Sequence, residues 1–104
     1  DFVNNGKFDL IKLIEKMCHN PAICFQIEGR GFIRENFFAD LVLVDINKPW
    51  KVTKENILYK CGWSPFEGNV FQSKVTHTFV NGHLVYHNGE FDESQKGMRL
   101  VFDR

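Results

Sequence analysis

Apolar side chains recur every three or four positions near the amino terminus of the chain. This stripe consists of Leu10, Leu13, Ile14, Met17 and Cys18. Because lysine and glutamate occupy the opposite side, the spacing predicts an amphipathic helix, with Asp9 as its N-cap. Asn20 and Pro21 are typical of a helix stop followed by a new helix start. We therefore expect a second, short helix that ends at Gly29.

Beyond residue 31 the pattern changes from helical to extended. Phe32-Ile33 predicts a short strand, and Asn36 marks a turn because asparagine tolerates a left-handed backbone. The run Ala39 to Ile46 (ADLVLVDI) is the strongest strand, with apolar residues on both of its faces. Such a pattern is typical of a strand covered on both sides. We therefore expect this strand to lie inside the protein and not at an exposed edge.

The middle of the chain contains shorter elements. Trp50 to Val52 predicts a short strand, and Thr53 is a suitable cap for a brief helix that reaches Tyr59. Residues 61–68 (CGWSPFEG) are rich in glycine and proline and predict an irregular loop. Aromatic side chains surround this loop, and we interpret them as anchors that hold it to a core. A platform for a ligand is the alternative.

The clearest unit of the sequence is a β-hairpin. Lys74–Val80 and His83–His87 flank Asn81-Gly82, the favoured pair for a two-residue type I′ turn. This turn pairs Phe79 with Leu84 and, by simple alternation, His77 with Tyr86. His77 is then expected on one face of the sheet, and His83 and His87 on the other. A further turn is expected at residues 88–89, and residues 98–102 predict a terminal strand or tail.

Composition limits the class of protein. The chain has 104 residues and a net charge of zero, which excludes the basic stripe of a nucleic-acid-binding protein. No apolar run approaches the roughly 20 residues of a membrane span. An eight-fold β/α barrel needs about 250 residues, so no complete barrel enzyme fits. The eleven Phe residues predict a packed interior.

The cysteines indicate the cellular compartment, and the first residue indicates how the chain relates to a longer protein. Cys18, Cys24 and Cys61 are odd in number and follow no secretory signal. They therefore predict buried or idle thiols in a reducing, cytoplasmic compartment. Because the sequence opens with Asp1, we expect either a mature product or a segment of a longer protein.

No set of residues forms a convincing catalytic or metal site. His83 and His87 share a predicted strand face, but four residues along a strand span about 13 Å. Ser64 lacks the surroundings of a nucleophile elbow, and Gly29-Arg30-Gly31 lacks those of a phosphate loop. Glu67 is a lone carboxylate that we expect to brace its loop. We therefore predict no catalytic, cofactor-binding or metal-binding residue in this chain.

Several segments nevertheless carry a recognisable pattern. These are Asn20-Pro21-Ala22, Gly29-Arg30-Gly31, residues 39–45 (ADLVLVD), residues 60–68 (KCGWSPFEG) and the hairpin of residues 75–86. Together they resemble the carboxyl-terminal portion of the dihydroorotase family, within the amidohydrolase superfamily. The SPFEG loop narrows the resemblance to dihydroorotases, because hydantoinases and allantoinases share the strand pattern. One departure is Asn36, where that family usually has glycine.

The resemblance implies an α+β, mainly β, architecture. In that family a metal-dependent barrel is flanked by a small composite β-sandwich. Residues 1–30 would be terminal helical elements of the barrel, and residues 31–104 the carboxyl-terminal part of the sandwich. The resemblance also implies that the missing amino-terminal barrel is the partner of this chain. Without it we expect open edges, which favour self-association.

The resemblance further implies an activity for the whole enzyme and none for this chain alone. Dihydroorotases use zinc to interconvert N-carbamoyl-L-aspartate and L-dihydroorotate in pyrimidine biosynthesis. Their metal ligands lie on barrel strands that have no counterpart here, so we expect no cofactor in this segment. No nucleic-acid or membrane partner is expected. The alternatives are a segment of another cyclic amidohydrolase, of hydantoinase or allantoinase type, and a non-catalytic β-sandwich interaction module.

Overall fold

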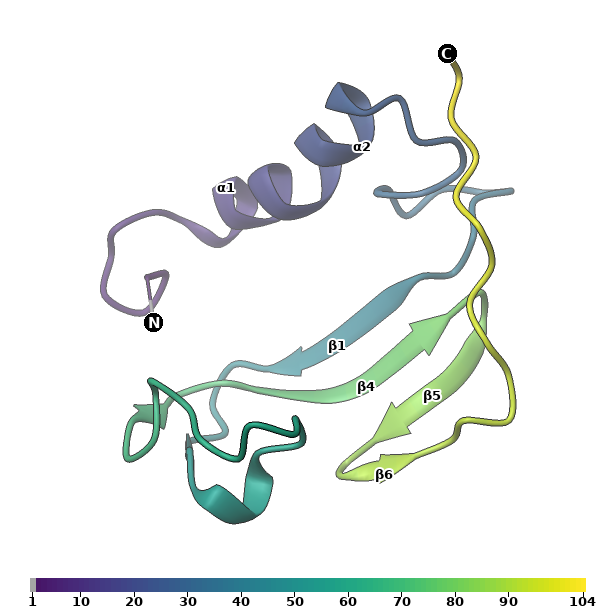
Figure 1. Cartoon of the computed structure of the whole chain (residues 1–104). Helices are drawn as coiled ribbons and strands as arrows, with labels where there is room; N and C mark the ends of the chain where they lie inside the picture. Colours follow the sequence, from purple (N-terminus) through teal and green to yellow (C-terminus); the bar gives the residue numbers. More distant parts are fainter. Residues whose placement is uncertain (1) are drawn as a thin grey trace.

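The chain forms one helical segment and two antiparallel sheets. A computed structural model describes residues 2–104. The larger sheet has the strand order β1-β4-β5-β6, and the smaller one pairs β2 with β3. Figure 1 shows the helical segment on one side of the molecule and the larger sheet on the other. This arrangement agrees with the predicted α+β class, in which strands outnumber helices.

The helical segment is continuous from Leu10 to Cys24. It consists of α1 (Leu10–Ile14), a π-helical turn (Glu15–His19) and α2 (Asn20–Cys24). Asp9 caps its amino end, since its carboxylate accepts the backbone N–H of Lys12 at 2.7 Å. The predicted amphipathic helix and its cap are therefore confirmed.

The predicted break at Asn20 and Pro21 is wrong. Asn20 has helical dihedrals (φ −62°, ψ −41°), and its N–H donates to the carbonyl of Glu15, five residues earlier. This wider π-helical turn lets the helix pass Pro21, which has no N–H to donate. The helix instead ends near Phe25, and Gln26 is left-handed (φ 55°). The second helix expected to end at Gly29 does not form separately.

The predicted strand at Phe32-Ile33 is also absent from the described chain. Gly31 is left-handed (φ 84°), and a Cβ there would lie 2.4 Å from the Cβ of Ala22. This close approach turns the chain onto the helix, where the ring of Phe32 stacks on His19 at 4.3 Å between centroids. The turn predicted at Asn36 is confirmed by its positive φ of 65°.

Six strands form the two sheets. They are β1 (Leu41–Asp45), β2 (Trp50–Lys51), β3 (Val70–Phe71), β4 (Lys74–Val80), β5 (His83–His87) and β6 (Glu90–Phe91). Thr53 caps a single 3₁₀ turn, Lys54–Asn56, and this helix is shorter than expected. The carboxyl-terminal residues form a tail that meets the end of the helical segment through a bridge between Ile27 and Phe102.

The hairpin of β4 and β5 is confirmed, but its register changes along the strands. Phe79 lies opposite Leu84, as predicted. One residue farther from the turn, a bulge on β5 shifts the pairing. His77 therefore lies opposite His87, and the predicted pairing of His77 with Tyr86 is wrong. The prediction that His77 and His87 occupy opposite faces is wrong for the same reason.

The expectation that the ADLVLVD strand is covered on both sides is wrong for the described residues. β1 stands at one end of the strand order and pairs only with β4. The side chains of Val42, Leu43 and Val44 are 49–54% exposed. No other described strand or helix covers both faces of β1, so its apolar residues remain in contact with solvent.

The expected packed interior is likewise missing from the described chain. Among residues 2–104, only Ala22 and Val52 are buried apolar residues. The accessible surface is 8466 Å², whereas a compact monomer of 12.2 kDa exposes about 6,100 Å². The radius of gyration of 15.7 Å likewise exceeds the roughly 13 Å of a compact chain of this length. The helix and the sheet therefore bury little surface against each other.

Candidate functional site

The most deeply placed charged group of the described residues is the guanidinium of Arg30, which is 9% exposed. It pairs with the carboxylate of Asp40 and donates to the side-chain oxygen of Asn81 at 2.9 Å. It also lies 4.2 Å from the ring centroid of Phe38. Neither the rejected phosphate loop at Gly29-Arg30-Gly31 nor the resemblance of that segment to dihydroorotases predicts this cluster.

The cluster around Arg30 joins three distant parts of the chain. The second oxygen of the Asp40 carboxylate accepts the backbone N–H of Asn81 at 2.8 Å. The next N–H of the hairpin turn, that of Gly82, donates to the carbonyl of Ala39 at 3.0 Å. The cluster thus connects the loop after the helical segment, the residues just before β1 and the β4–β5 turn. Because both terminal nitrogens of the guanidinium and both oxygens of the Asp40 carboxylate are paired within the cluster, it is a structural joint.

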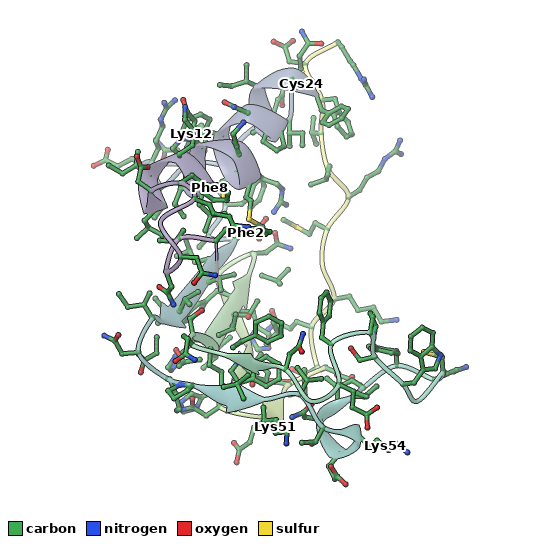
Figure 2. The ribbon with its side chains drawn as sticks, turned by 90° about the vertical axis from the view of Figure 1, so that its left-hand side faces the viewer. Phe2, Phe8, Lys12, Cys24, Lys51 and Lys54 are labelled. Atoms are coloured by element: carbon green, nitrogen blue, oxygen red, sulfur yellow. The ribbon has the colours of Figure 1, made fainter. Side chains whose placement is uncertain are left out.

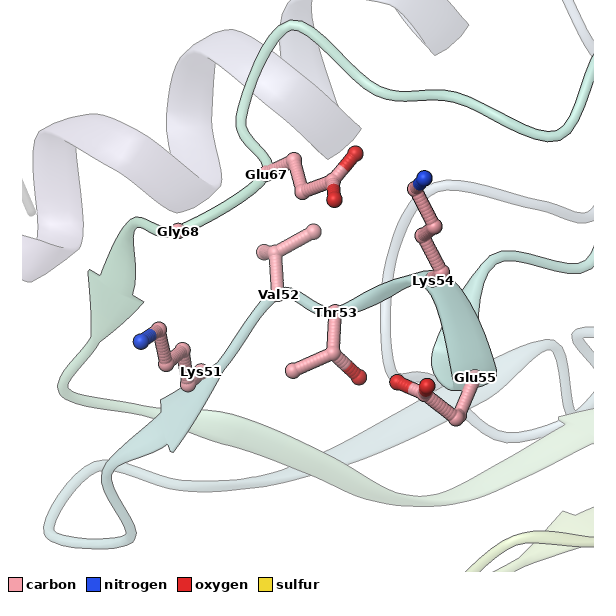
Figure 3. A pocket seen from close by; sticks show the side chains of 7 residues that line it. All are labelled: Lys51, Val52, Thr53, Lys54, Glu55, Glu67 and Gly68. Atoms are coloured by element: carbon pink, nitrogen blue, oxygen red, sulfur yellow. The ribbon is translucent and has the colours of Figure 1, made fainter.

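An open hollow of about 310 Å³ lies beside β2. It is lined by Lys51, Val52, Thr53, Lys54, Glu55, Glu67 and Gly68 (Figure 3). Within residues 2–104, neither lysine forms an ion pair with Glu67. The pKa of Glu55 is lowered because its own backbone N–H and the Thr53 hydroxyl donate to the carboxylate. The hollow offers mixed surface charge and no convergent set of donors.

A second hollow of about 310 Å³ has four aromatic residues among the nine that line it, namely Trp50, Tyr59, Phe66 and Phe71. Trp50 contacts Phe71 at 5.7 Å and Phe71 contacts Phe66 at 5.8 Å between ring centroids. The indole N–H of Trp50 donates to the carbonyl of Ser73 at 2.9 Å. Trp63, by contrast, is 60% exposed and does not line this hollow. The aromatic residues therefore anchor only part of the loop.

The residues considered for nucleophilic or acid–base chemistry have structural or exposed positions. Ser64 accepts the backbone N–H of Phe66 at 3.1 Å and braces its loop. The thiols of Cys18, Cys24 and Cys61 are free and exposed. Of the expected buried or idle thiols, the buried alternative is therefore wrong, and idle thiols stay a prediction.

The four histidines occupy three separate places. His19 stacks on Phe32. The Nε2 atom of His83 lies 3.0 Å from a carboxylate oxygen of Asp92, but makes no hydrogen bond with it. His77 and His87 stack on each other, with their ring centroids 4.4 Å apart. Pairwise spacing along the sequence missed this contact, because the bulge that produces it has no separate sequence signal.

The described residues do not fit a catalytic zinc centre. Among residues 2–104, no group of three or more histidine, cysteine, aspartate or glutamate side chains could hold a metal ion. Catalytic zinc requires three protein ligands and an open position. No reaction step can therefore be derived through zinc bound by these residues alone.

The helical segment carries apolar side chains that are exposed on the described surface. Along the apolar stripe of the helical segment, Met17 is 69%, Leu10 49% and Ile14 42% exposed. Figure 2 shows side chains standing free around the helical segment near Lys12 and Cys24. Exposed apolar patches of this kind mark surfaces that associate with other protein. The helices within residues 2–104 lack the length and hydropathy of a membrane-spanning helix.

Comparison with known proteins identifies a family and a solved structure that this chain matches. Residues 1–85 match the amidohydrolase family. The chain belongs to the amidohydrolase family. Among solved structures, the L-hydantoinase (dihydropyrimidinase) from Arthrobacter aurescens matches it with a TM-score of 0.76 and 32% identity. That match covers 86% of this chain and 20% of the hydantoinase chain.

Curated amidohydrolases give more specific similarities. The dihydroorotases of Pyrococcus abyssi and Thermococcus kodakarensis are 37% and 38% identical, over 97% and 96% of this chain. The allantoinase of Desulfitobacterium hafniense is 31% identical over 93%. The chain spans about a quarter of the length of these dihydroorotases, at 25% and 24%. The predicted resemblance to dihydroorotases is therefore confirmed.

Proposed function

We propose that this chain is a structural part of a dihydroorotase, the cyclic amidohydrolase that interconverts N-carbamoyl-L-aspartate and L-dihydroorotate. The observation that carries the proposal is the 36–38% identity to dihydroorotases over almost the whole chain. In this proposal the zinc ligands and the catalytic groups belong to the barrel of the whole enzyme. Residues of this chain shape and support that barrel from outside.

The proposal divides the chain into two parts. Residues 1–30 supply terminal helical elements of the barrel, and residues 31–104 supply the carboxyl-terminal part of the composite β-sandwich. The change from helix to strand between Cys24 and Leu41 supports this division. The likeness to a hydantoinase chain, which extends over 86% of this one, supports it as well.

The amino-terminal barrel is the proposed partner of the exposed helical surface. That surface is the apolar stripe of Leu10, Leu13, Ile14 and Met17. Leu10 and Met17 lie seven residues, or about two turns, apart on one face of the helical segment and are 49% and 69% exposed. Burial of one such side chain stabilises a protein by about 1.5–3 kcal/mol, so burial of this surface against the barrel is strongly favoured.

We also propose that the protein is cytoplasmic, which is supported by its three free cysteines.

A chimeric enzyme tests the proposal. This chain replaces the matching quarter of the Pyrococcus abyssi dihydroorotase, and hydrolysis of dihydroorotate is measured by absorbance. We expect the chimera to be active and the isolated chain to be inactive. Hydrolysis by the isolated chain, or a folded and zinc-loaded chimera without activity, would contradict the proposal.

Two variants of the chimera test the contact with the barrel. Met17→Glu places a charge in the proposed interface, and we expect it to lower the melting temperature and the activity. Ile33→Glu is the matched control, because Ile33 is 88% exposed and lies outside the helical segment. Equal loss in both variants would argue against the helical surface as the contact.

The second candidate function is hydrolysis of another cyclic amide. The allantoinase at 31% identity and the L-hydantoinase structure at 32% favour it. Allantoin and a substituted hydantoin are therefore assayed beside dihydroorotate with the same chimera. Because the substrate contacts of the barrel come from the Pyrococcus abyssi enzyme, this assay tests whether the chain itself changes substrate preference.

A further inference from the structure

The stacked pair of His77 and His87 has a geometry that the proposed function does not use. The two residues lie directly opposite each other on β4 and β5. Their ring centroids are 4.4 Å apart and their planes differ by 28°. His77 is half-buried and His87 is exposed, so the pair opens to solvent on one side.

The hydrogen bonds around His77 decide which ring nitrogen is free. The Thr76 hydroxyl donates to the carbonyl of Leu43 at 3.3 Å. Its single proton is therefore not available to donate to His77. Nδ1 of His77 lies 2.9 Å from the same hydroxyl oxygen. That oxygen therefore accepts a hydrogen bond from the Nδ1–H group, and Nε2 of this tautomer carries the unshared electron pair. A second partner that fixes the tautomer in this way is typical of metal-binding histidines.

We propose that His77 and His87 form a two-imidazole site for a divalent transition-metal ion. Two metal–nitrogen bonds of about 2.1 Å at a tetrahedral angle place the nitrogens about 3.4 Å apart. The two ring centroids are 4.4 Å apart on directly opposed residues, so the rings are close enough to approach one ion from neighbouring strands. Imidazole nitrogen selects nickel, copper and zinc over magnesium and calcium.

The remaining ligand positions are open. Glu90 lies opposite His87 on β6. His77, His87 and Glu90 are therefore neighbours across the three adjacent strands β4, β5 and β6. Glu90 does not complete a group of three metal ligands within residues 2–104. Water or an external ligand therefore fills the other positions, and the site binds an ion more weakly than a closed structural site. The tests below measure Ni²⁺ binding and need no hydrolytic activity, so this proposal and the proposed function can fail separately.

Nickel binding by the 104-residue chain tests the proposal. Cys18, Cys24 and Cys61 are first replaced by serine, since all three are exposed and thiolates compete for the ion. Titration calorimetry then measures the affinity for Ni²⁺, and Mg²⁺ serves as the control ion. Broadening of NMR signals by the paramagnetic ion locates the site. We expect binding of Ni²⁺ and not Mg²⁺, with broadening centred on residues 77 and 87.

Four histidine variants separate this site from its competitors. His77→Gln and His87→Gln should each abolish the calorimetric signal, whereas His19→Gln and His83→Gln should leave it unchanged. His83 is the matched control because it lies on the same strand as His87. Binding that survives in His87→Gln, or that is lost equally in His83→Gln, would overturn the proposal. Because His87 is exposed, its variant remains informative even if His77→Gln fails to fold.

Thr76 provides a second, independent measurement. Thr76→Val removes the hydroxyl that orients His77 and should weaken Ni²⁺ binding about tenfold. Thr76→Ser retains the hydroxyl and should restore the affinity. Equal affinities in the folded valine and serine variants would refute the assigned role of Thr76 and the tautomer on which the site depends.

Discussion

The buried guanidinium of Arg30 pairs with the carboxylate of Asp40, and this contact joins the loop after the helical segment to the residue that precedes β1. Residues ten positions apart meet here because the chain turns back over Phe38, whose backbone N–H donates to the carbonyl of Gly29 at 2.8 Å. The pair therefore stabilises a connection that few apolar contacts support, since only Ala22 and Val52 are buried apolar residues among those described.

Arg30→Lys tests this joint. Lysine retains the charge but cannot contact Asp40 and Asn81 from two separate nitrogens of one planar group. We expect a loss of about 1–3 kcal/mol in the free energy of unfolding, measured with urea in the chimeric enzyme. Arg104→Lys, in the exposed tail, is the control and should change stability by less than about 0.5 kcal/mol. Equal effects would show that Arg30 is an ordinary surface charge.

Gly31→Ala tests the close approach of the chain to the helix. The added Cβ would lie 2.4 Å from the Cβ of Ala22 and 2.8 Å from the carbonyl oxygen of Cys18. We expect a cost of about 1–3 kcal/mol from overpacking, in addition to the strain of a positive φ. Thermal unfolding of the chimera measures it.

Gly62→Ala isolates the strain from the overlap. Gly62 has a similar φ of +70°, but its added Cβ meets no atom within 4 Å. This variant should cost only about 1–2 kcal/mol. If both alanine variants lowered stability equally, the overlap with the helix would not exist in solution.

Local turn and cap chemistry made much of this fold predictable. Asp9 and the Asn81-Gly82 turn define the helix start and the hairpin through contacts within a few residues, and both predictions are confirmed. The passage of the helix through Pro21 was not predictable in this way. It depends on a shift from α-helical to π-helical hydrogen bonds, which the apolar spacing does not reveal.

The candidate metal site could not be predicted from the sequence for a similar reason. Alternation along β5 places His87 on the face opposite His77, and only the bulge after Leu84 brings the two together. A bulge adds one unpaired residue without a distinctive local motif. The exposure of β1 has a different cause. Apolar residues on both faces of a strand predict that both faces are covered, but they do not show whether this chain or another part of the protein covers them.

The carboxylate of Asp92 provides a pH-dependent test. Its pKa is lowered by the Ser94 hydroxyl, then by the Ser94 backbone N–H, and to a smaller degree by His83. Ser94→Ala removes the first contribution, so we expect the pKa of Asp92 to rise. Carboxyl-carbon NMR titration measures it. Glu55 is the internal reference, since its lowered pKa depends on Thr53 and its own backbone.

The sign of the accompanying stability change follows from the lowered pKa. A carboxylate whose pKa is lower in the folded than in the unfolded state stabilises the protein above the unfolded value. That contribution disappears as the pH falls through the folded pKa. The difference in stability between Ser94→Ala and the unchanged protein should therefore be present at neutral pH and vanish in acid. A difference that grew in acid would contradict the assignment.

Self-association of the isolated chain tests whether β1 is an open edge. An edge strand with unpaired backbone groups and exposed valines is a template for another strand, so we expect sedimentation to show association that increases with concentration. Val42→Lys places a charge on this strand and should shift the equilibrium toward monomer. Val101→Lys is the control, since Val101 is equally exposed, at 57% against 54% for Val42, but lies in the tail. A monomer at high concentration would show that β1 is protected in solution.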